Sequence, residues 1–98
     1  MSRLVTLSAI AALGFASTAA DARTEVFYTA ELAQPATQER AIAGGVAWNC
    51  QGTTCVAPRG TSRPLRVCRE LQREVGAVAS FSAKGKRLDA DKLASCNR

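Results

Sequence analysis

The four cysteines of this chain constrain its fold more than any other feature, and they follow the pattern C-x4-C-x12-C-x27-C. Three of them lie between Val46 and Cys68, together with the single tryptophan, Trp48. In a domain of this small size, hydrophobic burial and the loss of chain entropy nearly cancel, so such a domain usually needs covalent or metal crosslinks. We therefore expect the rest of the chain to pack around this cysteine-rich stretch.

The N-terminal residues have the pattern of a secretory signal peptide. Arg3 supplies a positive charge, residues 4–15 form a mostly apolar run, and residues 20–22 (Ala-Asp-Ala) form a small-residue cleavage motif. We predict cleavage after Ala22, within about two residues, which leaves residues 23–98 as a single small domain. The alternative is an uncleaved anchor, but the run is shorter than the ~20 apolar residues of a spanning helix. No later segment is apolar enough to span a membrane, so the sequence predicts a periplasmic or secreted protein.

The composition is that of one globular, basic domain. Apolar residues make up 47% of the chain and the formal net charge is +5, which cleavage leaves unchanged because residues 1–22 hold one basic and one acidic residue. A positive charge favours an envelope protein or an anionic surface as the partner. Nucleic acid is disfavoured, because the protein is exported and no aromatic side chains alternate with its arginines. Histidine is absent, which removes the usual general base, the cysteine–histidine nucleophile and imidazole metal ligands.

Alternating hydrophobicity predicts a small antiparallel sheet of three to four strands. The first strand spans residues 25–32, and its apolar face is formed by Val26, Tyr28, Ala30 and Leu32. Residues 41–50 form a second strand, in which Gly44-Gly45 marks a bulge or a close backbone approach. A further strand spans residues 77–83, and a brief pairing follows the turn at residues 84–86.

A tight hairpin is expected around the first two cysteines. If Gly52 occupies the first central position of a type II′ turn, its positive φ is readily accommodated. That register sets Cys50 opposite Cys55 and Trp48 opposite Ala57, so the apolar residues share one face. Trp48 is then expected in the core, over the Cys50–Cys55 pair.

Two helices complete the predicted α+β fold. The main helix has Ser62 as its N-cap, Pro64 in its first turn and Gly76 as its C-terminal cap. Its apolar face is formed by Leu65, Cys68, Leu71 and Val75. Asp89 caps a short C-terminal helix that ends at Cys96.

The four cysteines allow three disulfide pairings. The hairpin register places Cys50 beside Cys55 and leaves Cys68 to join Cys96, which we take as the predicted pairing. A zinc site with four thiolate ligands is the first alternative, although only the first two cysteines approach the close spacing of structural zinc ligands. A redox-active Cys50–Cys55 pair is the second, although no helix N-terminus follows Cys55 to stabilise a thiolate.

Charged side chains on the main helix give the remaining candidates. Arg66, Arg69 and Arg73 share the face opposite the apolar one and form a possible anion-binding stripe, which Arg59 and Arg63 could extend. The alternative is a solvated helix face. Glu70 and Glu74 lie one turn apart, a spacing that could serve paired acid and base roles. Glu70 is equally well spaced for surface ion pairs with Arg66 and Arg73, which is the interpretation we favour.

Four blocks of sequence carry a resemblance to a known family: residues 28–32 (YTAEL), 44–50 (GGVAWNC), 62–68 (SRPLRVC), and 88–89 with 93–97 (LD and LASCN). Together they resemble a small family of exported alphaproteobacterial proteins of unknown function with four cysteines. The resemblance covers nearly all of residues 23–98. It implies export and paired cysteines, and it carries over no catalytic residue.

These observations predict a non-enzymatic binding or envelope-associated module, crosslinked by two disulfides and without a cofactor or metal. Two other functions stay open at this point. One is a periplasmic thiol-redox protein, and the other is a binder of anionic surfaces through the arginine face of the main helix.

Overall fold

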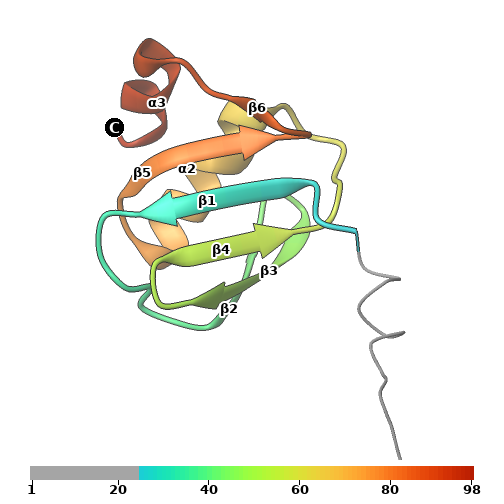
Figure 1. Cartoon of the computed structure of the whole chain (residues 1–98), viewed down its shortest axis with the longest axis vertical. Helices are drawn as coiled ribbons and strands as arrows, with labels where there is room; N and C mark the ends of the chain where they lie inside the picture. Colours follow the sequence, from blue (N-terminus) through green and yellow to red (C-terminus); the bar gives the residue numbers. More distant parts are fainter. Residues whose placement is uncertain (1–24) are drawn as a thin grey trace, which may run out of the picture.

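The computed structural model describes residues 25–98, so the predicted signal peptide, residues 1–22, lies outside the described part of the chain. The elements follow one another as β1 (Tyr28–Leu32), β2 (Arg40–Ala43), β3 (Val46–Gln51), β4 (Thr54–Ala57), α2 (Pro64–Val75), β5 (Val78–Ala83), β6 (Lys86–Arg87) and α3 (Ala90–Cys96). The fold is α+β, as predicted (Figure 1).

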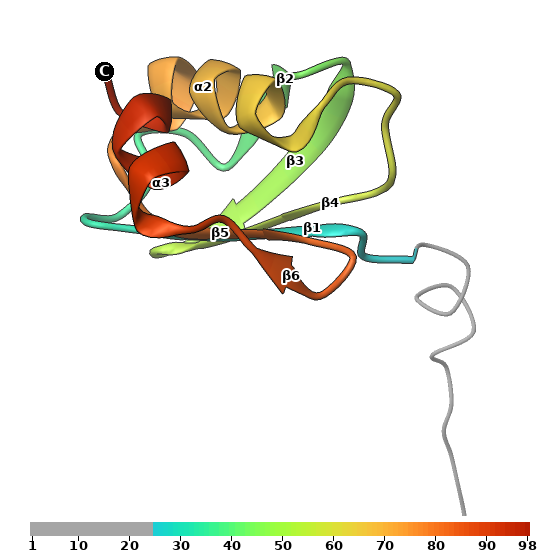
Figure 2. The same ribbon diagram turned by 90° about the horizontal axis from the view of Figure 1, so that it is seen from above.

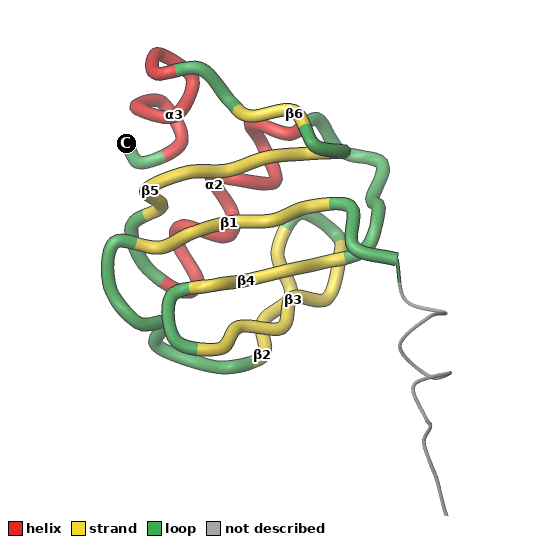
Figure 3. The backbone as a smooth tube through the Cα atoms, in the orientation of Figure 1, coloured by secondary structure: helices red, strands yellow, loops and turns green. Residues whose placement is uncertain are grey.

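The strands form one antiparallel sheet in the order β2-β3-β4-β1-β5-β6. Six strands exceed the three to four expected, and β1 lies at the centre although it comes first in the chain. Both helices cover the same face of the sheet (Figure 2). In the tube view, α2 lies behind the strands (Figure 3).

The predicted second strand, residues 41–50, is two strands joined by a tight turn. β2 ends at Ala43 and β3 begins at Val46, and these two residues face each other in the ladder. Gly44 and Gly45 have φ values of +64° and +79°, and a two-residue hairpin turn of type I′ needs positive φ at both central positions. The glycine pair therefore reverses the chain, where a bulge would have let it continue.

The hairpin around the first two cysteines has the predicted register. Cys50 pairs with Cys55 and Gln51 with Thr54 across β3 and β4. Gly52 has a φ of +63°, as the first central residue of a type II′ turn requires.

Three aromatic rings form the centre of the core between the sheet and α2. Tyr28, Trp48 and Phe81 come from β1, β3 and β5, and each is about 1% exposed. Their ring centroids lie 5.9 to 6.1 Å apart, which is a favourable spacing for aromatic pairs. The buried Trp48 indole donates its N–H to the carbonyl oxygen of Ala43 at 3.1 Å. Val26, which was expected on the buried face of the first strand, is instead 54% exposed because it precedes the paired part of β1.

The main helix ends as predicted but begins differently. Arg63 occupies the N-cap position and no side chain caps the helix, so the prediction that Ser62 is the N-cap is wrong. Pro64 at N1 has no N–H to satisfy, and its fixed φ suits the first helical position. The buried residues of α2 are Val67, Cys68, Leu71 and Val75, whereas Leu65 is only partly buried. The apolar face is therefore rotated toward Val67, which packs against the Gly44 turn.

The last third of the chain follows the predicted outline with one irregularity. A bulge shifts the register between β1 and β5, so that Glu31 faces Ser80 while Leu32 faces Val78. Val78 and Phe81 are therefore both buried, although strict alternation puts them on opposite faces. Asp89 caps α3 as predicted, because its carboxylate accepts the Lys92 N–H at 2.9 Å.

Candidate functional site

The four cysteines form two disulfides with the predicted partners. Cys50 is bonded to Cys55 across the β3–β4 hairpin, with their Cα atoms 4.0 Å apart. Cys68 of α2 is bonded to Cys96 of α3, with their Cα atoms 5.6 Å apart. All four are at most 1% exposed. The first bond closes a local turn, and the second holds the C-terminal helix against the main helix.

All four cysteines are used in disulfides, so no thiolate is left to ligate zinc, whereas an oxidised redox pair would contain the same Cys50–Cys55 bond. Residues 25–98 contain no free cysteine. They also contain no group of three or more histidine, cysteine, aspartate or glutamate side chains placed to hold a metal ion. The sulfur atoms are part of the core, where they pack with the aromatic rings and α2.

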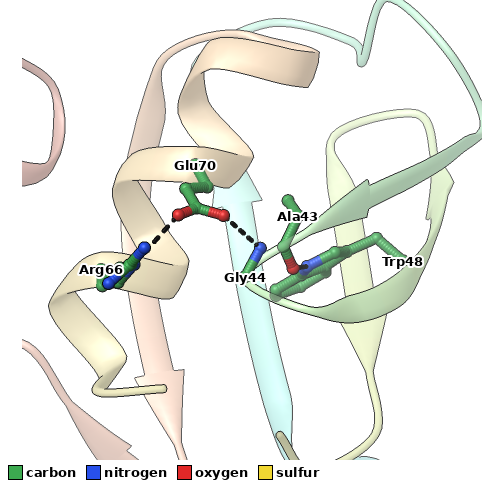
Figure 4. A network of polar contacts seen from close by, with 5 residues as sticks. All are labelled: Ala43, Gly44, Trp48, Arg66 and Glu70. Carbon is green, nitrogen blue, oxygen red and sulfur yellow. Dashed lines mark hydrogen bonds and ion pairs between the residues drawn. The ribbon is translucent and has the colours of Figure 1, made fainter. Parts of the chain in front are cut away.

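Glu70 connects the main helix to the turn between β2 and β3 (Figure 4). Its Oε1 accepts the Gly44 N–H at 2.8 Å, and its Oε2 accepts the Arg66 Nε–H at 3.1 Å. An added Cβ on Gly44 would lie 2.8 to 2.9 Å from atoms of Val67, so only glycine lets the turn approach the helix this closely. Glu70 is therefore a structural residue that holds the β2–β3 hairpin against α2 through a hydrogen bond with the backbone of Gly44.

The environment of Glu70 lowers its pKa below the ordinary value of 4.5. The hydrogen bond from the Gly44 N–H is the largest cause, followed by the hydrogen bond from Arg66. Both stabilise the ionised carboxylate. Glu70 therefore stays charged across the neutral range and is poorly suited to donate or accept protons there.

The predicted arginine stripe exists, but two of its members already have protein partners. Arg66 is paired with Glu70, and Arg69 donates its Nε–H to the Ser95 carbonyl oxygen at 3.2 Å. Arg73 is exposed, and its charge also acts on Glu70. The three arginines line a shallow hollow on the outer face of α2 that Glu70 shares. The stripe is thus a face of mixed charge, and two of its three arginines already form contacts within the protein.

A stronger concentration of positive charge lies at one end of the sheet, and sequence reasoning missed it. We call this surface the basic end, and define it by Arg59, Arg63, Lys84, Lys86, Arg87 and Lys92, all of them exposed. These residues line two adjoining hollows of 460 and 700 Å³ that share Pro64, Ala83 and Lys86. The only acidic side chain in either lining is Asp89, whose carboxylate is used to cap α3.

The basic end is assembled from four separate segments. Arg59 comes from the loop after β4, Arg63 from the start of α2, Lys84 to Arg87 from the β5–β6 hairpin, and Lys92 from α3. The end of β4 and the β5–β6 turn lie at the same end of the sheet, at the right in Figure 1. The residues of the basic end have no regular spacing in the sequence that would predict their clustering. Arg59 and Arg63 were predicted only as extensions of the helix stripe, and no binding role was predicted for the basic residues Lys84, Lys86 and Arg87.

Comparison with known proteins identifies a family and gives no activity. No curated protein and no solved structure shows significant similarity to the chain. The resemblance to an uncharacterised family is confirmed. Residues 9–98 match the family model of DUF8200, a family of unknown function, and the chain therefore belongs to that family.

Proposed function

We propose that the protein is an exported, non-catalytic binding module of the cell envelope that acts on an anionic partner. The observation that carries the proposal is the pairing of two buried disulfides with an exposed basic end on one small scaffold. Disulfides persist in oxidising compartments such as the periplasm. Clustered positive charge attracts anionic partners and speeds their encounter.

The non-catalytic part of the proposal is supported by the roles of the polar residues. Glu70 is engaged with the Gly44 backbone, Asp89 caps a helix, and Glu31 accepts hydrogen bonds from Thr53 and Thr54. Each of these carboxylates has a structural partner. The pKa of Glu70 is lowered by its hydrogen bonds from Gly44 and Arg66, away from the neutral range where general acids and bases work.

No helix within residues 25–98 combines the length and the apolar character that crossing a membrane demands. Export of the folded part would therefore depend on the N-terminal signal, and association with the envelope would depend on the surface of the domain.

The proposal is tested by recovering the protein, produced with its own N-terminus, from separated cell fractions. We expect a periplasmic or secreted form that begins near Arg23 and lacks four hydrogens relative to its fully reduced mass. Alkylation should label no cysteine before reduction and all four after it, whatever the redox state of the cell. A full-length, cytosolic protein with free thiols would overturn the proposal. A cysteine pair that cycles between states would instead favour the thiol-redox alternative.

A further inference from the structure

Resting on the proposed function, we infer that the anionic partner is the headgroup surface of a phospholipid bilayer, and that the protein meets it with the basic end and the adjoining Val26 and Phe27. The arginine face of α2 adjoins this surface, since its hollow shares Arg63 and Leu65 with a hollow of the basic end, but we infer that it is not the contact surface. Charge, backbone conformation and exposed apolar surface each support this assignment independently.

The charge of the basic end is free to act on a partner. Within residues 25–98, none of its six cationic side chains forms a hydrogen bond or ion pair with another side chain. Arg59 forms a cation–π contact, with its guanidinium carbon 5.4 Å from the centroid of the Phe27 ring. The helix α2 also begins here, with no acidic residue in its first turn, so the positive end of its dipole adds to the field. By contrast, Arg66 and Arg69 are engaged with Glu70 and Ser95.

Lys84 occupies a backbone conformation that its own side chain disfavours. It has a φ of +54° in the β5–β6 turn, and it is the only residue other than glycine with positive φ in residues 25–98. Asparagine or glycine is preferred at such a position. A residue that violates a local conformational preference, with no compensating gain in stability, is often found at a functional site. Here the outcome is a lysine at the tip of the β5–β6 hairpin, where it lines one of the two hollows of the basic end.

Apolar side chains lie exposed beside the same charges. Val26 is 54% exposed and is one of two large apolar side chains of the described residues to be so exposed. Its neighbour Phe27 is only partly buried and lines one of the two hollows with Lys84 and Lys86. The Phe27 carbonyl accepts the Lys84 N–H at 2.8 Å. This hydrogen bond fixes the apolar tip, formed by Val26 and Phe27, next to the β5–β6 hairpin.

This combination suits a bilayer better than an acidic protein. A protein partner is recognised through fixed, paired geometry, as in bidentate arginine–carboxylate contacts. The basic end instead carries lysine and arginine side chains on four separate segments, beside the partly exposed Val26 and Phe27. Binding to a layer of lipid headgroups does not require a fixed arrangement of charges, because each cation near the surface is attracted separately. Apolar side chains can also insert a short distance into the layer.

The experiment measures partition of the oxidised domain, residues 23–98, onto vesicles of phosphatidylglycerol and phosphatidylcholine. We expect binding that weakens as salt rises from about 0.05 to about 0.5 M, and no binding to pure phosphatidylcholine. The substitutions Lys84→Gln, Lys86→Gln and Arg87→Gln together should lower the partition coefficient about a hundredfold, at ~5-fold per basic residue. Free glycerol 3-phosphate at the same headgroup concentration should not compete, which separates a bilayer from a single phosphate ligand.

The matched control removes the same three charges from the helix face, with Arg66→Gln, Arg69→Gln and Arg73→Gln. This variant should lose less than about tenfold, and circular dichroism checks that both triple variants are folded. If the helix-face variant loses more than the basic-end variant, the inference is overturned and the arginine face is the contact surface. If the wild-type domain does not bind the anionic vesicles at all, the inference also fails. In either case, an exported and fully oxidised protein would leave the proposed function standing with a different anionic partner or contact surface.

Two single substitutions separate binding from folding. Lys84→Asn should raise the urea midpoint of unfolding while lowering partition about fivefold, because it relieves the backbone and removes a charge. A merely structural Lys84 would change the midpoint and leave partition unaltered, which contradicts the inference. Val26→Trp should show a blue shift of its fluorescence only when anionic vesicles are added, since Trp48 is already buried. An unchanged spectrum on fully bound protein would rule out contact by the apolar tip.

Discussion

The side-chain amide of Asn97 forms a pair of hydrogen bonds with the backbone of Val78. Its Oδ1 accepts the Val78 N–H at 2.8 Å, and its Nδ2 donates to the Val78 carbonyl oxygen at 2.8 Å. The short strand β6 pairs only with Ser82 and Ala83, so it does not reach this part of β5. Asn97 therefore takes the place of a neighbouring strand at the edge of the sheet.

Asn97→Ala should lower the free energy of unfolding by about 1–3 kcal/mol, because it leaves the backbone groups of Val78 without their partners. Urea denaturation of the oxidised protein measures this change. Ser95→Ala is the control, since its partly exposed hydroxyl makes one long contact, with Arg98 at 3.5 Å, and should change stability by less than about 0.5 kcal/mol. Equal stability of the two variants would show that the amide pair contributes nothing.

The two glycines of the β2–β3 turn provide a matched pair. Gly45→Ala adds a methyl group in open space at positive φ, and should cost ~1–2 kcal/mol. Gly44→Ala has the same backbone penalty and also forces a contact of 2.8 to 2.9 Å with Val67, which should add ~1–3 kcal/mol. Thermal and urea unfolding of both variants test this order. A Gly44→Ala protein as stable as Gly45→Ala would mean that the turn does not pack against α2.

Acid should remove a stabilising contribution of Glu70. Its pKa is lowered in the folded state, so the stabilisation is present above its unfolded pKa and is lost as the pH falls through the lower folded pKa. Glu70→Gln should reduce stability at neutral pH and flatten the loss of stability below about pH 4.5. Unfolding measured across that range, with Glu25→Gln as an exposed control, tests the prediction. A wild-type acid profile in Glu70→Gln would contradict it.

The two disulfides should differ in their effect on stability. The Cys68–Cys96 bond spans 28 residues of sequence and the Cys50–Cys55 bond spans 5. In the chain-entropy description, losing the longer loop costs about 3.5 kcal/mol and losing the shorter one about 2 kcal/mol. Double cysteine-to-alanine variants of each bond, compared by urea unfolding, measure both values. The reverse order would show that the hairpin bond contributes through more than loop closure.

Helix caps give a further test. Asp89→Ala should cost about 1 kcal/mol, because its carboxylate caps α3. Ser62→Ala should change stability by less than about 0.5 kcal/mol, since the structure gives Ser62 no capping hydrogen bond. A larger loss in Ser62→Ala than in Asp89→Ala would restore Ser62 as the helix N-cap.

Sequence patterns predicted the features that depend on short stretches of chain. The β3–β4 hairpin combines alternating side chains with a glycine that suits its turn, so Cys50 and Cys55 could be paired before the structure was known. The same holds for the Asp89 cap and for the end of α2 at Gly76. In each case the decisive residues lie within a few positions of one another.

The features that were missed depend on contacts between distant segments. Gly44-Gly45 was predicted to mark a bulge or a close backbone approach. The close approach is present, between Gly44 and Val67, but the pair forms a turn and not a bulge. The burial of Val78 beside Phe81 follows from a register shift against β1. The basic end joins four segments through the folded topology. None of these has a periodic signature in the sequence.

The central position of β1 has a kinetic consequence. Its two neighbours, β4 and β5, both follow it in the chain, and its pairing with β5 extends to Ala83. During synthesis from the N-terminus, β1 has neither neighbour until those later strands have emerged. Contacts between segments far apart in sequence also form slowly, because the entropy cost of closing a long loop comes before the favourable energy of the contacts. The middle of this sheet is thus completed late, after most of the polypeptide has become available.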